Sequence, residues 1–317
     1  MKTRLKLTLS QTSGLVGFAM LAFVLLIAFF GRFAAPHDPT EPISFPGQPP
    51  SAELLLGSDY LGRDVLSRVL FGGMSVILIG LSATLLAYLF GTSFGMIAGY
   101  VEGWIGSLIM RAVDVSLAFP PLLVLLLLVG GLQAHIWVLV LGVVLVQIPS
   151  VTRVTRAATA SVSRSSYVEA AIARGEPTLK IWRSDILPNI LPPVLADFGI
   201  RFGLSIILVA SMNFLGLGLA PPAADWGLMT SENQAYITLN PFSVVAPGVM
   251  LAFLSISVNL LADAYLRVTA GDIDARPSFL ARLGRSKRAI APTARLSVDG
   301  STTGNGPTSP TSQGAVI

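Results

Sequence analysis

Six long apolar stretches, separated by polar segments, dominate the chain and predict an all-α, polytopic membrane bundle of six transmembrane helices. A helix needs about 20 residues to cross about 30 Å of hydrocarbon, and each stretch comes close to that length. Within the third span, Pro120 and Pro121 should break or bend the helix, with a simple kink as the preferred interpretation. We place the spans near residues 15–31, 76–99, 109–131, 135–151, 194–215 and 242–261.

The segments between the spans divide the chain further. Residues 1–32 contain the first span, which is long for a signal peptide and precedes no clean small-x-small cleavage site. Residues 33–73 form an external loop, proline-rich at first, with an amphipathic helix near residues 61–70 that fits either the outer membrane interface or a position packed on the bundle. Residues 74–267 form the membrane core, and residues 268–317 predict a cytoplasmic, largely disordered tail.

The distribution of basic residues orients the chain. If both termini lie in the cytoplasm, 16 Lys and Arg residues face inwards, and only Arg32, Arg63 and Arg68 lie outside. Short cytoplasmic loops of membrane proteins carry such an excess of Lys and Arg. We therefore expect a multi-pass protein of the plasma membrane, with both termini and a polar segment at residues 165–190 on the cytoplasmic side.

This polar segment predicts a hairpin of two short helices. A Ser-x-x-Glu capping box from Ser166 to Glu169 should begin the first helix, which is about two turns long. Gly175 should end it in a left-handed conformation. Ala170 and Ala171 are small enough to let another surface approach closely.

The second helix of the hairpin should begin at Pro177, which suits a first helical turn, and stop at Pro188. Helices this short are marginal alone in water, because the nucleation cost is spread over few hydrogen bonds. We therefore expect the hairpin to need a partner surface. The apolar residues of the second helix are Leu179, Ile181, Trp182, Ile186 and Leu187.

Composition excludes several kinds of chemistry. With no cysteine and two histidines, His37 and His135, the chain offers no thiol nucleophile and no set of ligands suited to a transition metal. It contains no Gly-x-x-x-x-Gly-Lys-Ser/Thr loop to hold a nucleotide phosphate. The net charge of +4 follows membrane topology, so no nucleic acid partner is predicted. We expect no catalytic residue, no metal and no cofactor on this chain.

The second span contains a Gly-x-Ser-x-Gly pattern around Ser93, which is typical of a hydrolase nucleophile elbow. That motif requires a strand-to-helix turn, whereas Ser93 lies inside an apolar span and neither histidine is placed as its base. Gly91, Gly95 and Gly99 recur every four residues and line one helix face. Such a row of small residues favours close helix packing.

Two pairs of charged residues lie within the predicted spans. Arg111 and Asp114 are three residues apart, and Asp197 and Arg201 are four apart, so each pair can form an ion pair on one helix face. Both pairs lie toward the cytoplasmic side, which favours a structural or inner-vestibule role over a substrate or proton relay. Near the opposite side, Trp226 fits an interfacial anchor better than an external gate.

Several motifs carry a resemblance to a known family. The hairpin resembles the Glu-Ala-Ala loop of permease subunits in binding-protein-dependent ABC importers. Four further motifs, within about residues 50–267, resemble the dipeptide, oligopeptide and nickel branch, and within it the second, C-type permease. They are Leu-Gly-Arg-Asp-Val-Leu-Ser-Arg at 61–68, Arg-Ala-Val-Asp at 111–114 with Ala-Phe-Pro at 118–120, Ile-Leu-Pro-Asn at 186–189, and Phe-Leu-Gly-Leu-Gly at 214–218 with Pro-Pro at 221–222 and Trp-Gly at 226–227.

The chain also departs from that branch. Asp185 stands where the branch usually has histidine, and Glu176 with Pro177 replaces a milder pair, so the fit to a particular ATPase surface is altered. The tail after Pro277 has no recognised counterpart.

The resemblance implies a complex in the membrane lipid. Its other members are a second permease subunit in a heterodimer, two ABC ATPase subunits that hold ATP and Mg, and an external substrate-binding protein. The expected function is import of di- and oligopeptides by alternating access, with nickel or another small solute as the alternative cargo. An ion-driven secondary transporter is a rival class, but it would need ionisable residues near the midplane and often an internal repeat.

In such a complex the hairpin docks on an ATPase subunit and transmits its closure to the spans. Each hairpin residue then has a role: Glu169 caps, Ala170 and Ala171 permit close approach, Gly175 turns the chain, and apolar anchors precede Pro188. These anchors are Trp182, Ile186 and Leu187.

Overall fold

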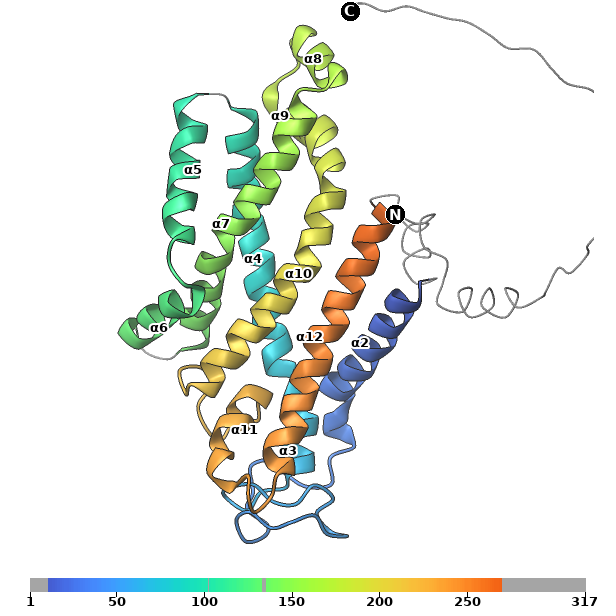
Figure 1. The fold of residues 1–317 in the computed structure, drawn as a ribbon, viewed down its shortest axis with the longest axis vertical. Coiled ribbons are helices and arrows are strands. Elements are labelled where there is room, and N and C mark those ends of the chain that lie inside the picture. The colour runs from blue at the N-terminus through green and yellow to red at the C-terminus, as the bar shows by residue number, and fades with distance from the viewer. Residues whose placement is uncertain (1–10, 102, 133–134, 270–317) are drawn as a thin grey trace, which may run out of the picture. The chain divides into compact units, whose positions relative to one another are not determined.

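A computed structural model of the protein describes residues 11–101, 103–132 and 135–269 (Figure 1). The described residues form helices joined by turns, with one isolated antiparallel bridge between Ser58 and Asp64. The predicted tail from residue 270 onward lies outside the described residues, as do the first three basic residues of the chain. The elements are α2 (Thr12–Phe30), η1 (Gly31–Phe33), α3 (Val65–Phe71), α4 (Gly73–Tyr100), α5 (Trp104–Leu117), α6 (Pro121–Leu132), α7 (Ile136–Ser163), α8 (Ser166–Ala173), α9 (Thr178–Ile181), the π-helical turn η2 (Trp182–Ile186), α10 (Leu187–Phe214), α11 (Trp226–Glu232), η3 (Gln234–Tyr236) and α12 (Phe242–Thr269).

The predicted all-α membrane bundle is confirmed in the described part of the chain. Five helical stretches, built on α2, α4, α7, α10 and α12, are long and apolar enough to cross a membrane. The predicted third span is instead two helices, α5 and α6, bent by 85°. The preferred simple kink is therefore wrong. Pro120 biases the residue before it away from helical geometry, and Pro121 suits the first position of a new helix, so the chain breaks completely between them.

Three spans extend well beyond their apolar stretches, and the sixth, predicted to end at residue 261, continues as α12 to Thr269. The fourth, predicted to end at residue 151, continues as α7 to Ser163, with Pro149 inside the helix. The fifth, predicted to start at residue 194, is helical from Leu187 and contains Pro192 and Pro193. Hydrophobicity marks the part of a helix that lies in lipid, whereas hydrogen bonding continues the helix into the polar region beyond it.

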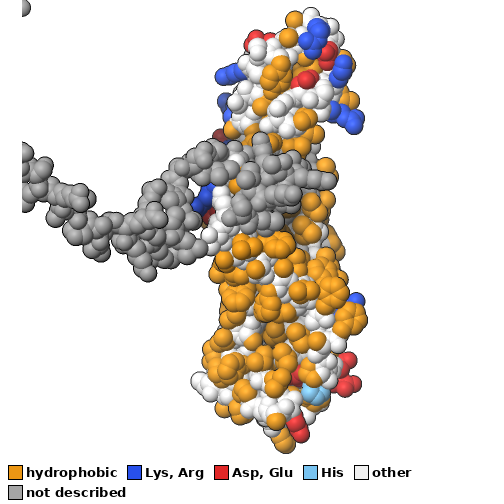
Figure 2. Space-filling model, turned by 90° about the vertical axis from the view of Figure 1, so that its right-hand side faces the viewer, with side chains coloured by type: hydrophobic (Ala, Val, Ile, Leu, Met, Phe, Trp, Pro, Cys, Tyr) orange, Lys and Arg blue, Asp and Glu red, His pale blue; other side chains and the backbone are white. Residues whose placement is uncertain are grey.

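The two ends of the helical bundle carry different elements (Figure 1). The helix α8 lies at one end, toward which α2 begins and α12 finishes, and α3 and α11 lie at the opposite end. On the face in Figure 2, hydrophobic side chains cover the middle, while Lys, Arg, Asp and Glu gather toward the ends. Apolar residues of α2, such as Phe18, Phe23 and Leu26, are exposed. A hydrophobic band between charged ends is the surface that a bilayer requires.

The helices α4 and α7 approach each other closely along the glycine row. A Cβ atom added at Gly91 would lie 2.7 Å from the Cβ of Val151, and one at Gly95 would lie 2.5 Å from the Cβ of Thr155. At Gly99 the added atom would lie 2.7 Å from the backbone oxygen of Arg156. These distances are shorter than van der Waals contact, so only glycine fits.

We predict that Gly95→Ala destabilises the fold by about 1–3 kcal/mol, because overpacking forces α4 and α7 apart. Gly130→Ala is the matched control, since a Cβ atom there meets nothing within 4 Å. Thermal unfolding of the two variants in detergent measures the difference. Equal midpoints for both variants would contradict the close packing of the glycine row.

Candidate functional site

The helix α8 begins without the predicted capping box. Its N-cap is Ser165, one residue earlier than expected, and Ser166 is already helical. The Ser165 hydroxyl donates a 2.6 Å hydrogen bond back to the carbonyl of Val162, and it accepts no hydrogen bond from an amide of α8. Within the described part of the chain, the exposed Glu169 side chain has no hydrogen bond or ion pair. The role of Glu169 as a cap is therefore wrong, and its carboxylate is free to meet a partner.

The end of α8 agrees with the sequence. Gly175 has a φ of +71°, which a side chain would strain. Its amide donates to the carbonyl of Ile172 at 2.9 Å, and the amide of Glu176 donates to the carbonyl of Ala171 at 3.2 Å. This pair of hydrogen bonds is a Schellman motif. The glycine therefore reverses the chain between α8 and α9.

Ion pairs between charged side chains bridge the turn between α8 and α9 on its solvent-exposed side. The Glu176 carboxylate lies 2.8 Å from the Arg174 guanidinium and 3.3 Å from the Lys180 ammonium. The Arg174 hydrogen bonds, with help from Lys180, keep the pKa of Glu176 below its usual value. The turn thus keeps its charge pairs across neutral pH.

The inner face of α8 packs on its own chain. Val168 and Ala171 are fully buried against Ile181, Ile186 and Ile190. Neither Ala171 nor Ile186 can therefore contact a partner protein, which corrects both assignments. An eight-residue helix is too short for the periodicity of its sequence to show that Ala171 faces inwards and Ala170 outwards.

Two other predicted anchors also serve the chain itself. The Trp182 ring meets Tyr100 of α4 edge to face, with ring centroids 5.8 Å apart, and Leu187 is half-buried against the same cluster. These contacts supply the partner surface that the short helices need. Pro177, expected inside the second helix, is its N-cap.

The outward side of the hairpin presents a mixed polar and apolar surface, which we call the tip surface. Tyr167, Ile172 and Leu179 are 45%, 51% and 65% exposed, respectively. Glu169 and Ala170 are also exposed. The sequence did not single out Tyr167 and Ile172 as exposed residues of the hairpin. The tip surface consists of Tyr167, Glu169, Ala170, Ile172 and Leu179.

The predicted stop at Pro188 is wrong. Helical structure continues from Thr178 to Phe214 through α9, η2 and α10, a stretch of 37 residues. Pro188 has no amide to donate, and its ring would clash with the carbonyl four residues earlier. The wider π-helical turn η2, closed by the amide of Leu187 on the carbonyl of Trp182, accommodates the ring. Leu179 of the tip surface therefore lies on the same uninterrupted helix as the fifth span, and α8 packs beside the start of that helix.

Polar side chains inside the membrane connect three helices. Asp197 and Arg201 of α10 form the ion pair that their spacing predicts, at 3.3 Å. The Tyr88 hydroxyl of α4 donates to Asp197 at 2.6 Å, and the Gln147 amide of α7 donates to the backbone oxygen of Arg201 at 3.2 Å. Ser205 adds hydrogen bonds to Gln147 and to the Thr84 hydroxyl. The cluster therefore links α4, α7 and α10.

The other predicted pair does not form. Asp114 lies 2.6 Å from Arg153 of α7, and both side chains are more than half exposed. Arg111 makes no ion pair with any residue that the structure describes. The partner of Asp114 lies on another helix, α7, and residue spacing along a single helix cannot reveal such a contact.

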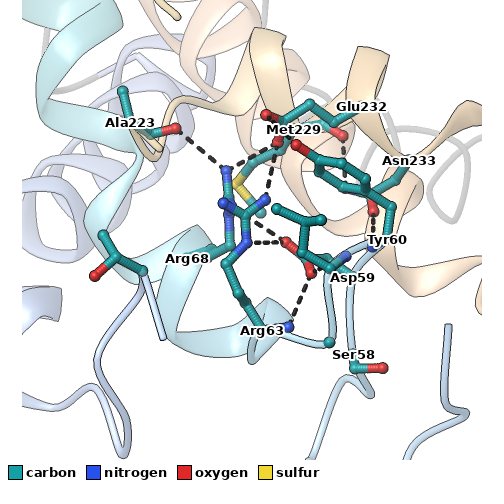
Figure 3. Close-up of polar contacts among 12 residues, drawn as sticks. Ser58, Asp59, Tyr60, Arg63, Arg68, Ala223, Met229, Glu232 and Asn233 are labelled. Atoms are coloured by element: carbon teal, nitrogen blue, oxygen red, sulfur yellow. Dashed lines mark hydrogen bonds and ion pairs between the residues drawn. The ribbon is translucent and has the colours of Figure 1, made fainter. Parts of the chain in front are cut away.

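At the opposite end of the bundle lies a buried ionic cluster (Figure 3). The Asp59 carboxylate accepts from Arg63 at 2.6 Å and from Arg68 at 3.1 Å. Glu232, the last residue of α11, lies 3.0 Å from Arg68 and 3.4 Å from Arg63. These side chains are at most 7% exposed. We call Asp59, Arg63, Arg68 and Glu232 the outer ionic cluster.

The outer ionic cluster decides between the two positions predicted for the amphipathic helix. Arg63, Arg68 and Val65 are all buried, so α3 packs on the bundle and does not lie in the membrane interface. The Tyr60 hydroxyl also donates to Glu232 at 3.1 Å. Burial raises the pKa of Glu232, although Arg63 opposes this shift.

Trp226 is a core residue, and the interfacial anchor is wrong. Its side chain is fully buried, and its indole nitrogen donates to the carbonyl of Val69 at 2.8 Å. The ring lies against the backbone of Gly73, where an added Cβ would come within 2.6 Å of it. The tryptophan therefore joins α11 to the start of α4, and its indole N–H is satisfied inside the protein.

Asp225 caps α11 from a buried position. Its carboxylate accepts from the amides of Gly227 and Leu228 and from the Asn213 side chain. Within the described part, its second oxygen has no hydrogen-bond partner. Burial raises the pKa of Asp225 to about 6, against these hydrogen bonds.

Comparisons with known proteins agree with this architecture. Residues 91–269 match the family model described as "Binding-protein-dependent transport system inner membrane component". The chain is 36% identical to the di/tripeptide transport system permease protein DppC of Pseudomonas aeruginosa over 77% of this chain and 84% of that protein. It is 34% identical to the glutathione transport system permease protein GsiD of Pectobacterium atrosepticum over 76% and 82% of the two chains.

A solved structure supports the fold alone. An inward-facing structure of the MetNI methionine ABC transporter aligns with a TM-score of 0.53 and 16% identity. The alignment covers 64% of this chain and 95% of that chain.

We predict that Asp225→Asn removes a pH dependence of stability. In the range from about pH 4 to about pH 6, the folded state still holds the Asp225 proton while the unfolded state has released it, so stability falls as pH rises. The full loss is about 3 kcal/mol above pH 6. Asparagine caps helices about as well as aspartate and carries no charge. The variant should therefore exceed the parent in thermal midpoint at pH 7.5 and match it near pH 4.

Unfolding scans in detergent across this pH range measure the effect. Glu41→Gln, which changes an exposed carboxylate of the outer loop, is the matched control and should follow the parent at every pH. A constant difference between Asp225→Asn and the parent would contradict the titration of Asp225.

Proposed function

This chain belongs to the family of binding-protein-dependent transport system inner membrane components, and from that premise we propose that it imports di- and oligopeptides as the permease subunit of an ATP-driven transporter. Two named relatives support the cargo, because one is named for di- and tripeptides and the other for glutathione, itself a short peptide. The protein works by alternating access in the plasma membrane.

The proposed assembly contains two permease subunits, two ATPase subunits and an external substrate-binding protein. ATP and Mg bind to the ATPase subunits. The end with α8 faces the cytoplasm, since basic residues flank α8 on both sides: Arg164 precedes it, and Arg174, Lys180 and Arg183 follow it. Both chain termini lie on the same side.

One observation carries this function: the helix that bears Leu179 of the tip surface continues without a break into a membrane-spanning helix. A helix of 37 residues is about 55 Å long, whereas the hydrocarbon layer is about 30 Å thick. Roughly half of it therefore remains outside the hydrocarbon, where a soluble ATPase can hold it. Motion of the tip moves the fifth span and its polar cluster directly.

ATP can shift the inward and outward states only by the difference in its affinity for them. The docking contact must therefore be stiff. The buried cluster around Ala171 and Ile186 supplies stiffness from within the chain, and the exposed Tyr167, Ile172 and Leu179 supply the contact.

We predict that a photoreactive maleimide placed on Leu179→Cys cross-links to the ATPase subunit in the assembled complex. The chain has no natural cysteine, so the introduced thiol is the single attachment point. Phe45→Cys, 78% exposed in the outer loop, is the control and should give no ATPase cross-link. A membrane-impermeant maleimide should label Phe45→Cys in intact cells, and Leu179→Cys only after permeabilisation. The reverse labelling pattern would overturn the orientation.

A second prediction concerns coupling. Leu179→Asp should lower peptide-stimulated ATP hydrolysis of the reconstituted complex at least tenfold, since a charge replaces a desolvated apolar contact. Leu179→Met keeps the apolar contact and should retain activity. Stimulation by a dipeptide with its binding protein, compared with a free amino acid or nickel, tests the cargo. Full activity of Leu179→Asp would exclude the proposed docking.

A further inference from the structure

A cavity of about 370 Å³ lies between the junction of α5 and α6 on one side and the helices α7 and α10 on the other. Gln147, one of its lining residues, lies about 16 Å along α7 from Ile136, the first residue of that helix. The hydrocarbon layer is about 30 Å thick, so the cavity lies within the membrane. Polar groups that face a cavity at this depth mark the path of a transported solute.

Two polar side chains of the lining have unused hydrogen-bonding groups. The Gln147 side chain is buried, and its Nε2 group donates to the backbone oxygen of Arg201 and to the Ser205 hydroxyl. Its Oε1 atom has no hydrogen-bond partner within the described part of the chain. The Arg201 guanidinium uses only its Nε group, on Asp197, so Nη1 and Nη2 donate to no described residue. A ligand that accepts from Arg201 and donates to Gln147 removes the cost of leaving these groups unpaired.

The charge around the cavity is balanced. Arg201 is paired with Asp197, and beside the lining Asp114 is paired with Arg153. The lining residues come from three segments that the structure describes without a gap, and these contain no Asp, Glu or His. The segments are 115–124, 145–150 and 201–208. A metal cation finds no carboxylate or imidazole ligand in this lining, whereas a zwitterion with one carboxylate and an N–H donor adds no net charge.

Apolar side chains form most of the remaining lining. Leu117 and Val124 contribute from α5 and α6, and Leu204 and Leu208 contribute from α10. Contacts with apolar walls are non-directional, so they accept ligand side chains of different shapes. The volume lies near the lower end of the range for small-molecule sites, about 300–1,000 Å³. Such a cavity suits a short chain whose backbone is recognised and whose side chains vary.

We infer that this cavity binds a di- or tripeptide during its passage through the membrane. The terminal carboxylate of the peptide accepts from Nη1 and Nη2 of Arg201, a fork that matches two carboxylate oxygens. A backbone N–H of the peptide donates to Oε1 of Gln147. The Ser150 hydroxyl, which also lines the cavity and has no hydrogen bond to a described residue, is a further partner. This inference rests on the proposed function and names the residues that contact its cargo.

The position of Arg201 connects the peptide site to the proposed ATPase contact. Arg201 lies on the same uninterrupted helix as Leu179 of the tip surface, whereas Gln147 lies on α7. Motion of that helix relative to α7 therefore changes the separation of the two groups that hold the peptide. Affinity for the peptide then differs between the inward and outward states, which is the condition for coupling.

The test measures photo-labelling of the purified transporter complex in lipid nanodiscs by a dipeptide of alanine and p-benzoylphenylalanine. The binding protein is left out, because it makes its own selection among peptides. We expect the label to map to residues 115–124 or 145–150 by mass spectrometry. Alanyl-phenylalanine should compete about tenfold better than its C-terminal amide, which lacks the carboxylate. Arg201→Gln should lower labelling about tenfold and abolish the preference for the free acid.

Arg153→Gln is the matched control for charge, because it removes an ion-paired arginine that does not line the cavity, and it should keep both labelling and preference. Ser150→Leu is an independent variant, since it fills the cavity while Arg201 and Gln147 remain, and it should also lose labelling. Its control is Ser93→Leu, the same change at an exposed position of α4. Unchanged labelling in Arg201→Gln or Ser150→Leu, or equal competition by the amide, overturns the site.

Peptide-stimulated ATP hydrolysis, with the binding protein added back, is measured on the same preparations. Stimulation of the parent complex without photo-labelling overturns the site and leaves the proposed function standing. Labelling of the parent complex without stimulation supports the site and counts against the proposed function. The two proposals can therefore fail separately.

Discussion

The arrangement of this protein depends on how one helix passes a proline. At Pro188 the regular hydrogen-bond ladder cannot continue, and an ordinary α-helix would kink or stop. The π-helical turn η2 widens the backbone by one residue, so the helix proceeds into the membrane. Because of that single adjustment, the exposed hairpin and the fifth span form one mechanical element. The buried contacts of Ile181, Ile186 and Ile190 hold the adjusted turn against its neighbours.

The opposite end of the bundle is held by polar contacts of long sequence separation. Arg68 reaches the carboxylate of Glu232, and the Trp226 indole reaches the backbone of Val69. Buried ion pairs contribute little net stability compared with apolar contacts of the same volume, but removing one partner is costly. Their value here is geometric, since they fix the position of the outer loop relative to α11.

Hydrophobic stretches predicted the membrane bundle well, because burial in lipid imposes a strong and local signal on the sequence. The end of α8 was also predictable, since only glycine readily adopts the conformation of Gly175. The outward and inward faces of the hairpin were not, because Ala171 and Ile186 are buried by contacts between separate segments. The same limit explains Trp226 and Asp114, whose partners lie more than 35 residues away in the sequence.

The glycine contact between α4 and α7 constrains how the molecule can move. Backbones that meet without intervening side chains have little room to slide, since each glycine sits opposite one particular residue of the other helix. We expect α4 and α7 to move together as one rigid unit through the transport cycle. Rearrangement would then fall to segments with interrupted backbones, foremost the right-angled junction of α5 and α6. In a protein assembled this way, α4 and α7 keep their relative positions, and conformational change is confined to a few breaks between helices.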